Sequence, residues 1–378
     1  MRHRHLQAAL AALGLLASAS NVQAQPFGVF DVRAAGMGGV GVATGARYAT
    51  FNNPALLTTA EEQREWFLMA PGMGRQRGDP DDLKDNLAAF KQTANSLDAS
   101  PTIANRDAAL ASLNAMGGDI YRESGNSTIL LAIPSRLLSG AAYIHIYDWA
   151  NARASVTGDN LSDPANPQYA SRIEHRGAQV LENGITAAKS INGTGWRRQL
   201  ALGLNVKFLF VEGYGYSEDV RDAKTGIDRN QYSSNAVFNL DIGVLKEFGV
   251  WKLGLMAKNL FSGNFEYGNT GDYFDITPQL RAGFAYQSRR TVFEFDLDLT
   301  RNQASGFDSA TQMAALGVEF KPWRWLALRS GYQQNLTGTQ AGTISLGLGV
   351  ALGFLMFDIA GSHSKEQDGA HAQLAFQF

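Results

Sequence analysis

Residues 199–210 of the chain read QLALGLNVKFLF and alternate between two kinds of side chain. Large apolar side chains occupy every second position from Leu200 to Phe210, and the positions between Gln199 and Lys207 are polar or small. Successive residues of a β-strand point to opposite faces, so this segment predicts a strand with one oily face and one polar face.

The same alternation recurs along the chain from about residue 124 onward. It predicts fourteen strands, and most of them reach the length of about 9–11 residues that crosses a membrane. Their expected bounds are 64–74, 124–134, 138–155, 172–190, 198–217, 231–247, 251–262, 277–288, 291–301, 311–321, 324–335, 342–352, 354–363 and 370–378.

The connections between these strands alternate between tight turns and longer polar loops. A soluble sandwich would also alternate, but short turns on one side and long loops on the other are typical of outer-membrane barrels. A sheet in hydrocarbon must close on itself, because an open edge leaves backbone groups unpaired. Aromatic residues near the expected strand ends suit interfacial girdles: Tyr143, Tyr147, Trp149, Tyr214, Tyr216, Phe261, Tyr273, Phe274, Trp323, Trp325 and Tyr332.

The N-terminus predicts a secretory signal peptide over residues 1–24. Arg2 and Arg4 precede a largely apolar run, which ends at the small-residue cleavage signal Val22-Gln23-Ala24. A membrane anchor is the alternative, but the run is shorter than the about 20 residues that a spanning helix needs. Together with the strands, this places the mature chain in the outer membrane of a Gram-negative bacterium, surrounded by its lipid.

Composition excludes several functions. With no cysteine, the chain has no disulfide, no thiolate metal site and no lipid-bearing cysteine. A net charge of -2 offers no basic patch for nucleic acid. No nucleophile elbow or metal-binding histidine motif occurs, so we expect no enzyme, no metal and no cofactor.

Two segments break the strand pattern. Residues 25–60 are small and glycine-rich, and residues 79–117 are helical in pattern, with Asp79-Pro80 as the expected helix start. Within the second segment, an apolar stripe would form a capture surface at the outer mouth; packing of this insert onto itself or onto the barrel rim is the more ordinary use of such a stripe. The stripe includes Leu83, Leu87 and Phe90.

Charged side chains occupy many of the positions expected to face the lumen. They either line a polar interior or pair with one another and fill it, and pairing is the simpler interpretation for each of them. These residues are Lys207, Asp241, Arg281, Glu294, Asp296, Asp298, Glu319 and Arg329.

Residues 33–57, RAAGMGGVGVATGARYATFNNPALL, combine a glycine-rich stretch with an Asn-Pro-Ala-Leu phrase. The G-x-G-x-x-G match inside it lacks the βαβ context of a nucleotide site. Ahead of a barrel, the segment resembles the FadL family of outer-membrane transporters for hydrophobic compounds and its PorV-like relatives. With the helical insert after the first strand, it most resembles the plasmid-transfer TraF-type barrels. The resemblance is specific over this segment and architectural over the rest.

By this resemblance, residues 25–60 form a hatch and residues 61–378 form the barrel. The hatch residues either move as a gate or make a structural turn that folding requires; they are Gly36, Gly38, Gly39, Gly41, Asn53, Pro54 and Ala55. The TraF name also covers thiol-active proteins, which a chain without cysteine cannot be. The charged lumen departs from an apolar FadL pocket and argues against a fatty-acid-like ligand.

The last strand ends on alternating aromatics, Phe376 and Phe378. A terminal strand of this form resembles the signal that the outer-membrane assembly machinery reads. Two functions follow as hypotheses. One is passive uptake or binding of small hydrophobic compounds through a plugged lumen. The other is a non-transporting barrel that docks a conjugation or secretion component. A continuous apolar tunnel favours the first, and a charge-paired, filled lumen favours the second.

Overall fold

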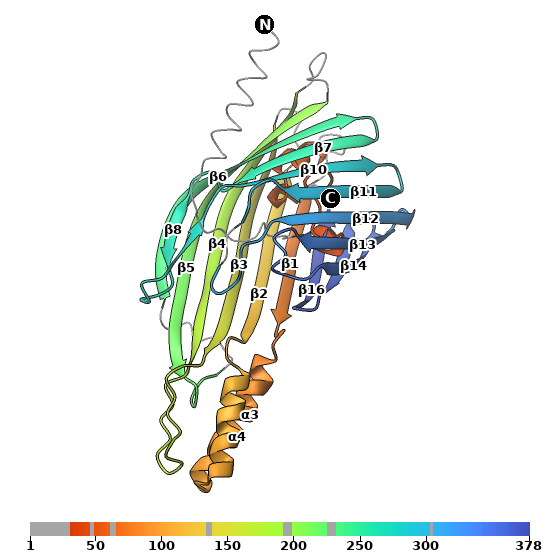
Figure 1. Cartoon of the computed structure of the whole chain (residues 1–378). Helices are drawn as coiled ribbons and strands as arrows, with labels where there is room; N and C mark the ends of the chain where they lie inside the picture. Colours follow the sequence, from red (N-terminus) through yellow and green to blue (C-terminus); the bar gives the residue numbers. More distant parts are fainter. Residues whose placement is uncertain are drawn as a thin grey trace.

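The computed structural model describes residues 31–45, 49–60, 66–133, 138–191, 199–224, 232–302 and 305–378. The expected signal peptide, residues 1–24, lies outside this range, as do residues 25–30 and 46–48 of the expected hatch. The described residues form one closed, antiparallel barrel with helical elements inside it and beyond one end (Figure 1).

All fourteen expected strands are present, with ends shifted by a few residues. Each pairs antiparallel with its neighbour in sequence, and the circle closes where the first strand pairs with the last. The barrel strands are β1 (Phe67–Gly78), β2 (Ile120–Ile133), β3 (Ser139–Ser155), β4 (Arg172–Ile191), β5 (Leu200–Asp219), β6 (Tyr232–Phe248), β7 (Trp251–Lys258), β10 (Gln279–Gln287), β11 (Thr291–Asp298), β12 (Met313–Trp323), β13 (Leu326–Asn335), β14 (Thr343–Leu352), β15 (Leu355–His363) and β16 (Asp368–Gln377).

The apolar face of the strands points outward, as in a barrel that meets lipid. On β5, Phe208 is 52 % exposed, whereas the neighbouring Lys207 is fully buried in the lumen. The tight turns gather at the end where β1 begins and β16 ends, which we call the tight-turn end. The longer connections gather at the opposite, long-loop end.

The barrel wall is uneven in height. β5 has 20 residues, but β7 has 8 and β11 has 8. The long strands β2–β5 therefore stand beyond the short ones on the other side (Figure 1). The connection between β7 and β10 was expected to be a plain loop, but it carries a two-stranded hairpin of β8 (Gly263–Glu266) and β9 (Tyr273–Ile276).

The expected helical insert consists of α3 (Leu83–Ala99) and α4 (Ile103–Ala115), which project from the long-loop end. The helix starts later than Asp79-Pro80. Asp79 nevertheless caps it, because its carboxylate accepts from the amides of Leu83 and Lys84 at 2.7 and 3.2 Å. Among the described helices, none is long and apolar enough to cross a membrane.

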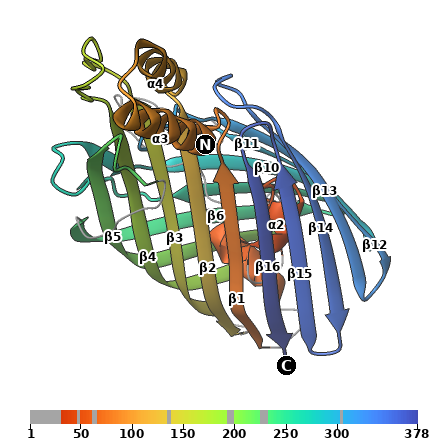
Figure 2. The same ribbon diagram turned by 90° about the horizontal axis from the view of Figure 1, so that it is seen from below.

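The hatch lies inside the barrel (Figure 2). It contains α2 (Val32–Gly36) and the 3-10 helices η1 (Ala49–Phe51) and η2 (Pro54–Ala60). Most of its described residues are buried, although several of them are polar, so their backbone and side-chain groups need partners inside the lumen.

The expected aromatic girdle is only partly correct. Five of its members are 46–58 % exposed on the outside, namely Phe261, Tyr273, Trp323, Trp325 and Tyr332. Five others are at most 7 % exposed and belong to the interior: Tyr143, Tyr147, Trp149, Tyr214 and Phe274.

Candidate functional site

Glycines of the barrel wall let the hatch backbone approach closely. A Cβ on Gly331 would overlap the main chain of Met37, and one on Gly243 would overlap the side chain of Asn53. The same holds around much of the wall, because side chains there would collide with the plug. The wall glycines in contact with the hatch are Gly203, Gly243, Gly254, Gly283, Gly317, Gly331 and Gly347.

The expected hatch glycines face this wall. Gly36 lies against Gly347, where a Cβ would come within 2.9 Å of the Gly347 Cα. Gly38 and Gly39 have φ of 74° and 88°, a left-handed conformation that favours glycine, and they turn the chain after α2. The amide of Gly41 donates to Asp296 at 2.8 Å.

Two carboxylates of β11 hold the hatch by its backbone. Glu294 accepts from the amides of Ala43 and Thr44 at 2.7 and 3.0 Å. Asp296 accepts from the amides of Gly41 and Val42 at 2.8 and 3.1 Å. Four consecutive amides are thus satisfied by charged acceptors, which form stronger bonds than neutral ones.

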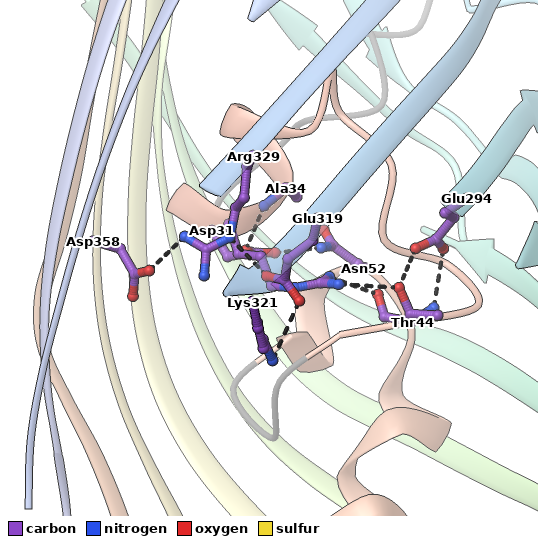
Figure 3. A network of polar contacts seen from close by, with 10 residues as sticks. Asp31, Ala34, Thr44, Asn52, Glu294, Glu319, Lys321, Arg329 and Asp358 are labelled. Carbon is purple, nitrogen blue, oxygen red and sulfur yellow. Dashed lines mark hydrogen bonds and ion pairs between the residues drawn. The ribbon is translucent and has the colours of Figure 1, made fainter. Parts of the chain in front are cut away.

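An ion-pair network ties α2 to side chains of β12, β13 and β15 (Figure 3). Glu319 accepts from Arg33 of the hatch at 3.1 Å and from Arg329 at 2.7 Å. Arg329 also pairs with Asp358 at 2.5 Å. Nearby, burial raises the pKa of the Asp31 carboxyl above its ordinary value, although the hydrogen bond from the Ala34 amide opposes the shift.

The remaining lumen charges are paired as well. Lys207 lies 2.8 Å from Asp241 and 3.4 Å from Glu182. Arg281 lies 2.5 Å from Asp298 and donates to the carbonyl of Gly39 at 3.2 Å. All eight expected lumen charges are at most 8 % exposed, so this part of the interior is filled by protein.

The Asn-Pro-Ala anchor sits on β5 and β6. Asn53 donates to the carbonyls of Val42 and Val244 at 2.8 and 3.1 Å, and its Oδ1 accepts from the Ala55 amide at 3.0 Å. Pro54 begins η2 and lies against the wall at Gly203. Asn53 therefore joins two parts of the hatch to each other and to the barrel.

A ladder of rings on β3 was not anticipated from the sequence. Tyr143, His145, Tyr147 and Trp149 alternate along the strand and all point inward. Phe51 of the hatch lies 4.6 Å from Tyr143 between ring centroids, His145 lies 5.2 Å from Tyr147, and Tyr147 lies 6.5 Å from Trp149. We call Tyr143, His145, Tyr147 and Trp149 the β3 ladder. It runs from the hatch toward the long-loop end.

The β8–β9 hairpin packs against the part of this ladder nearest the long-loop end. Phe274 meets Trp149 edge-on at 5.2 Å, and Tyr267 lies 4.8 Å from Phe274. Burial raises the pKa of Tyr267 to about 12, so its hydroxyl stays protonated at neutral pH, and its oxygen accepts from the Gly306 amide at 2.6 Å. The hairpin thus fills the part of the lumen beside the long strands β3 and β5.

A cavity of ≈ 250 Å³ remains between the hatch and the long-loop end. We call it the outer chamber. Ala35 and Gly39 of the hatch form its floor, Tyr147 and Trp149 stand on one side, and Ser345 stands on another.

The expected capture surface is not open to solvent. Leu83, Leu87 and Phe90 are at most 4 % exposed and form an apolar cluster with residues of β2, β3 and β4, including Tyr121, Ala152 and Ile173. This corrects the capture interpretation, because burying the stripe on the rim is what holds α3 on the barrel.

The chain is a closed barrel of fourteen strands with its N-terminal segment packed inside, and solved proteins share this fold. The chain belongs to the family described as "F plasmid transfer operon, TraF, protein", whose model matches residues 50–298. A search among curated protein sequences returns no match.

Solved structures show the same fold at low identity. One is the "TodX deltaS2S3 mutant monoaromatic hydrocarbon channel", with a TM-score of 0.56 and 12 % identity over 92 % of this chain and 98 % of that chain. Another is the P. putida toluene transporter TodX, with a TM-score of 0.51 and 13 % identity over 92 % of this chain and 97 % of that chain.

Proposed function

We propose that this chain forms an outer-membrane channel that binds small hydrophobic compounds in its lumen and lets them pass when the hatch moves. The observation that carries the proposal is the β3 ladder, which links the outer chamber to Phe51 of the hatch. Solved channels of this fold are named for monoaromatic hydrocarbons and toluene, which supports a ligand of that kind.

The ladder offers what such ligands need. Aromatic side chains bind apolar compounds through large flat surfaces, and ring pairs add about 0.5–1.5 kcal/mol beyond the area that they bury. The charges on the facing wall are paired with each other or with the hatch, so they do not compete as open hydration sites. The apolar route therefore follows β3 and ends on the hatch.

Passage requires the hatch to move, because it lies across the lumen. An engineered disulfide that locks the hatch to the barrel wall tests this step. Val42 of the hatch packs on Met256 of β7, and the chain has no cysteine of its own. Val42→Cys combined with Met256→Cys creates one possible disulfide between plug and wall.

Purified barrels would be placed in liposomes and the entry of radiolabelled toluene measured. We expect the reduced double variant to pass toluene like the unmodified chain and the oxidised one to block it. A matched control pairs Ser330→Cys with Leu346→Cys, which face each other across β13 and β14. Oxidation of this control should change nothing.

Equal toluene entry through the oxidised and reduced lock would exclude hatch movement as the route. Toluene entry no faster than into empty liposomes would exclude the channel itself. Thiol titration confirms that each disulfide has formed.

A second function is favoured by a different observation. The hatch is held by charged acceptors and ion pairs on several strands, as a permanent plug would be. The family description names a plasmid transfer operon. We therefore also propose a docking barrel for a transfer or secretion component. If the oxidised lock restores plasmid transfer to a deletion strain as fully as the unmodified chain, hatch movement is dispensable and docking is supported. Loss of transfer with the lock would count against it.

A further inference from the structure

Three neighbouring tight turns carry a concentration of cationic side chains. They join β6 to β7, β10 to β11 and β12 to β13. The amide of Gln287 donates to the carbonyl of Val250 at 2.7 Å, which joins the first turn to the second. The amide of Lys321 donates to the carbonyl of Arg290 at 2.7 Å, which joins the second turn to the third. One arc of the tight-turn end therefore gathers Lys246, Lys252, Arg289, Arg290, Lys321 and Arg324.

The arginines of this arc have no acidic partner. Two of the lysines are neutralised by neighbours, since Lys252 pairs with Glu247 and Lys321 lies 3.3 Å from the buried carboxylate of Glu319. The three arginines are exposed and form no ion pair with any carboxylate in the described part of the chain; they are Arg289, Arg290 and Arg324. We call these three arginines the cationic edge.

Arginines at the long-loop end are placed differently. Arg153 pairs with Glu174 across β3 and β4, and Arg221 of the loop after β5 pairs with Asp98 of α3. Their charge is matched within the chain. The cationic edge instead leaves its charge available to an anion from outside the protein.

Strand length places the cationic edge at the level of the lipid headgroups. β10 has 9 residues and β11 has 8. At about 3.4 Å per residue these strands are about 27–31 Å long, and the tilt of barrel strands reduces their height to little more than the apolar band of about 25 Å. The turn between them therefore stays close to the hydrocarbon. Because the short turns of such barrels face the periplasm, the cationic edge meets the periplasmic leaflet.

The outer face beside the cationic edge has the layering of a membrane interface. Trp323 and Trp325 flank Arg324, are exposed, and stack with their ring centroids 5.6 Å apart. On β11, the exposed Phe293 lies three positions from Arg290. Tryptophan and tyrosine rings collect where hydrocarbon meets headgroups, and the guanidiniums follow directly beyond the rings. The arginines thus lie at the depth of lipid phosphates.

We propose that the cationic edge binds anionic phospholipid headgroups of the periplasmic leaflet. A guanidinium matches the oxygens of a phosphate with two parallel hydrogen bonds, and basic clusters at a membrane surface attract anionic lipids. A net-neutral phosphatidylethanolamine fits less well, because its ammonium group is repelled by the same arginines. A lipid reaches the edge without leaving the bilayer, and its acyl chains lie on the exposed rings. The site is on the outer wall and is independent of passage through the lumen.

Native mass spectrometry of the full barrel in non-ionic detergent tests the site. The barrel would be titrated with dioleoyl phosphatidylglycerol or with dioleoyl phosphatidylethanolamine, which have the same acyl chains, and the lipid-bound fraction measured. We expect the unmodified chain to bind phosphatidylglycerol at least about tenfold more tightly. Inorganic phosphate at the same concentration should not displace it, because phosphate lacks the chains that rest on the rings.

Two matched variants locate the binding. The test variant removes the cationic edge through Arg289→Gln, Arg290→Gln and Arg324→Gln, and it should bind the two lipids equally. The control variant removes three exposed cations from the long-loop end and should keep the preference; its changes are Lys224→Gln, Arg301→Gln and Lys365→Gln. If the test variant does not assemble, Arg289→Gln with Arg290→Gln replaces it, and Arg301→Gln with Lys365→Gln becomes the control.

Equal affinity of the unmodified chain for the two lipids would overturn the proposal. A preference for phosphatidylglycerol that persists in the test variant would do the same and would leave the arginines to a soluble acidic partner. Equal losses in the test and control variants would reduce the effect to net charge. Displacement of the lipid by inorganic phosphate would identify a site for free anions and would also contradict the proposal.

Discussion

At the residue scale, the hatch is held by contacts of two kinds. Wall glycines remove side chains from the interface, so backbone meets backbone directly. The carboxylates of Glu294 and Asp296 then satisfy the amides that this close packing would otherwise leave buried without partners. The glycines allow the hatch backbone to pack closely on the wall, and the carboxylates bind it there through hydrogen bonds.

Glu294→Gln together with Asp296→Asn should loosen the hatch without unfolding the barrel. Each change replaces a charged acceptor by a neutral one. It also places a side-chain NH₂ group near the backbone N–H groups of the hatch, which are donors too, at a cost of about 1–3 kcal/mol. We expect hydrogen exchange at residues 41–44 to accelerate by at least about tenfold. Glu212→Gln, on the exposed outer face of β5, is the matched control. Unchanged exchange at residues 41–44 would show that these carboxylates do not hold the hatch.

Alternation along the strands assigned eight charged residues to the lumen, and all eight are at most 8 % exposed. It did not predict their partners, because the fit of the hatch against the wall depends on close approach between distant segments rather than on period. The aromatic residues of β3 were placed wrongly for a related reason. Both faces of β3 carry apolar side chains, with Ile144 49 % exposed outside and Tyr143 buried inside, so the pattern alone does not tell which face is the lumen.

At the scale of elements, the fourteen barrel strands and the two-helix insert follow from periodicity. The β8–β9 hairpin does not, because its strands have 4 residues each and lie within a polar loop. Strands this short carry too few repeats to show a period. Its position is decided by contacts with Trp149 and the β5 wall rather than by its own sequence.

Phe90→Ala should release the helical insert from the rim. Phe90 is fully buried against the cluster below α3, and removing a buried phenyl ring costs about 3–5 kcal/mol. We expect limited proteolysis to cut within residues 83–115 while the barrel stays intact. Leu110→Ala alters a side chain that is 38 % exposed and should leave the digest unchanged. Resistance of the Phe90→Ala insert would mean that other contacts hold it.

At the scale of the molecule, closure depends on the last strand. β16 completes the barrel by pairing with β1, and the final residue bonds to Trp66 through two main-chain hydrogen bonds of 2.6 and 3.0 Å. Phe376 stacks on Phe354 at 6.4 Å, whereas Phe378 is 63 % exposed. The exposed terminal ring therefore has little packing role within the barrel.

Phe378→Ala should reduce the amount of assembled barrel in the outer membrane several-fold while leaving the thermal midpoint of the assembled fraction nearly unchanged. If the ring contributes to recognition by the assembly machinery but not to packing, its loss lowers the amount of assembled barrel without lowering the thermal midpoint. Heat-modifiable migration on gels measures both quantities. Leu352→Ala, at an exposed apolar position near the same end, is the control. Normal assembly of the Phe378→Ala chain would remove the ring from the proposed signal.

The unequal wall also has a consequence for how the protein meets its neighbours. β5 exceeds β7 by 12 residues, from 20 and 8, which at about 3.4 Å per residue is about 40 Å along the strand. A symmetric cylinder looks alike from every direction in the membrane plane, but this one has a low flank and a high flank. Molecules that approach the low flank reach the mouth sooner. The barrel is therefore not equivalent under rotation about the membrane normal. In an array of copies, the contacts that each copy makes depend on which flank it turns toward its neighbour.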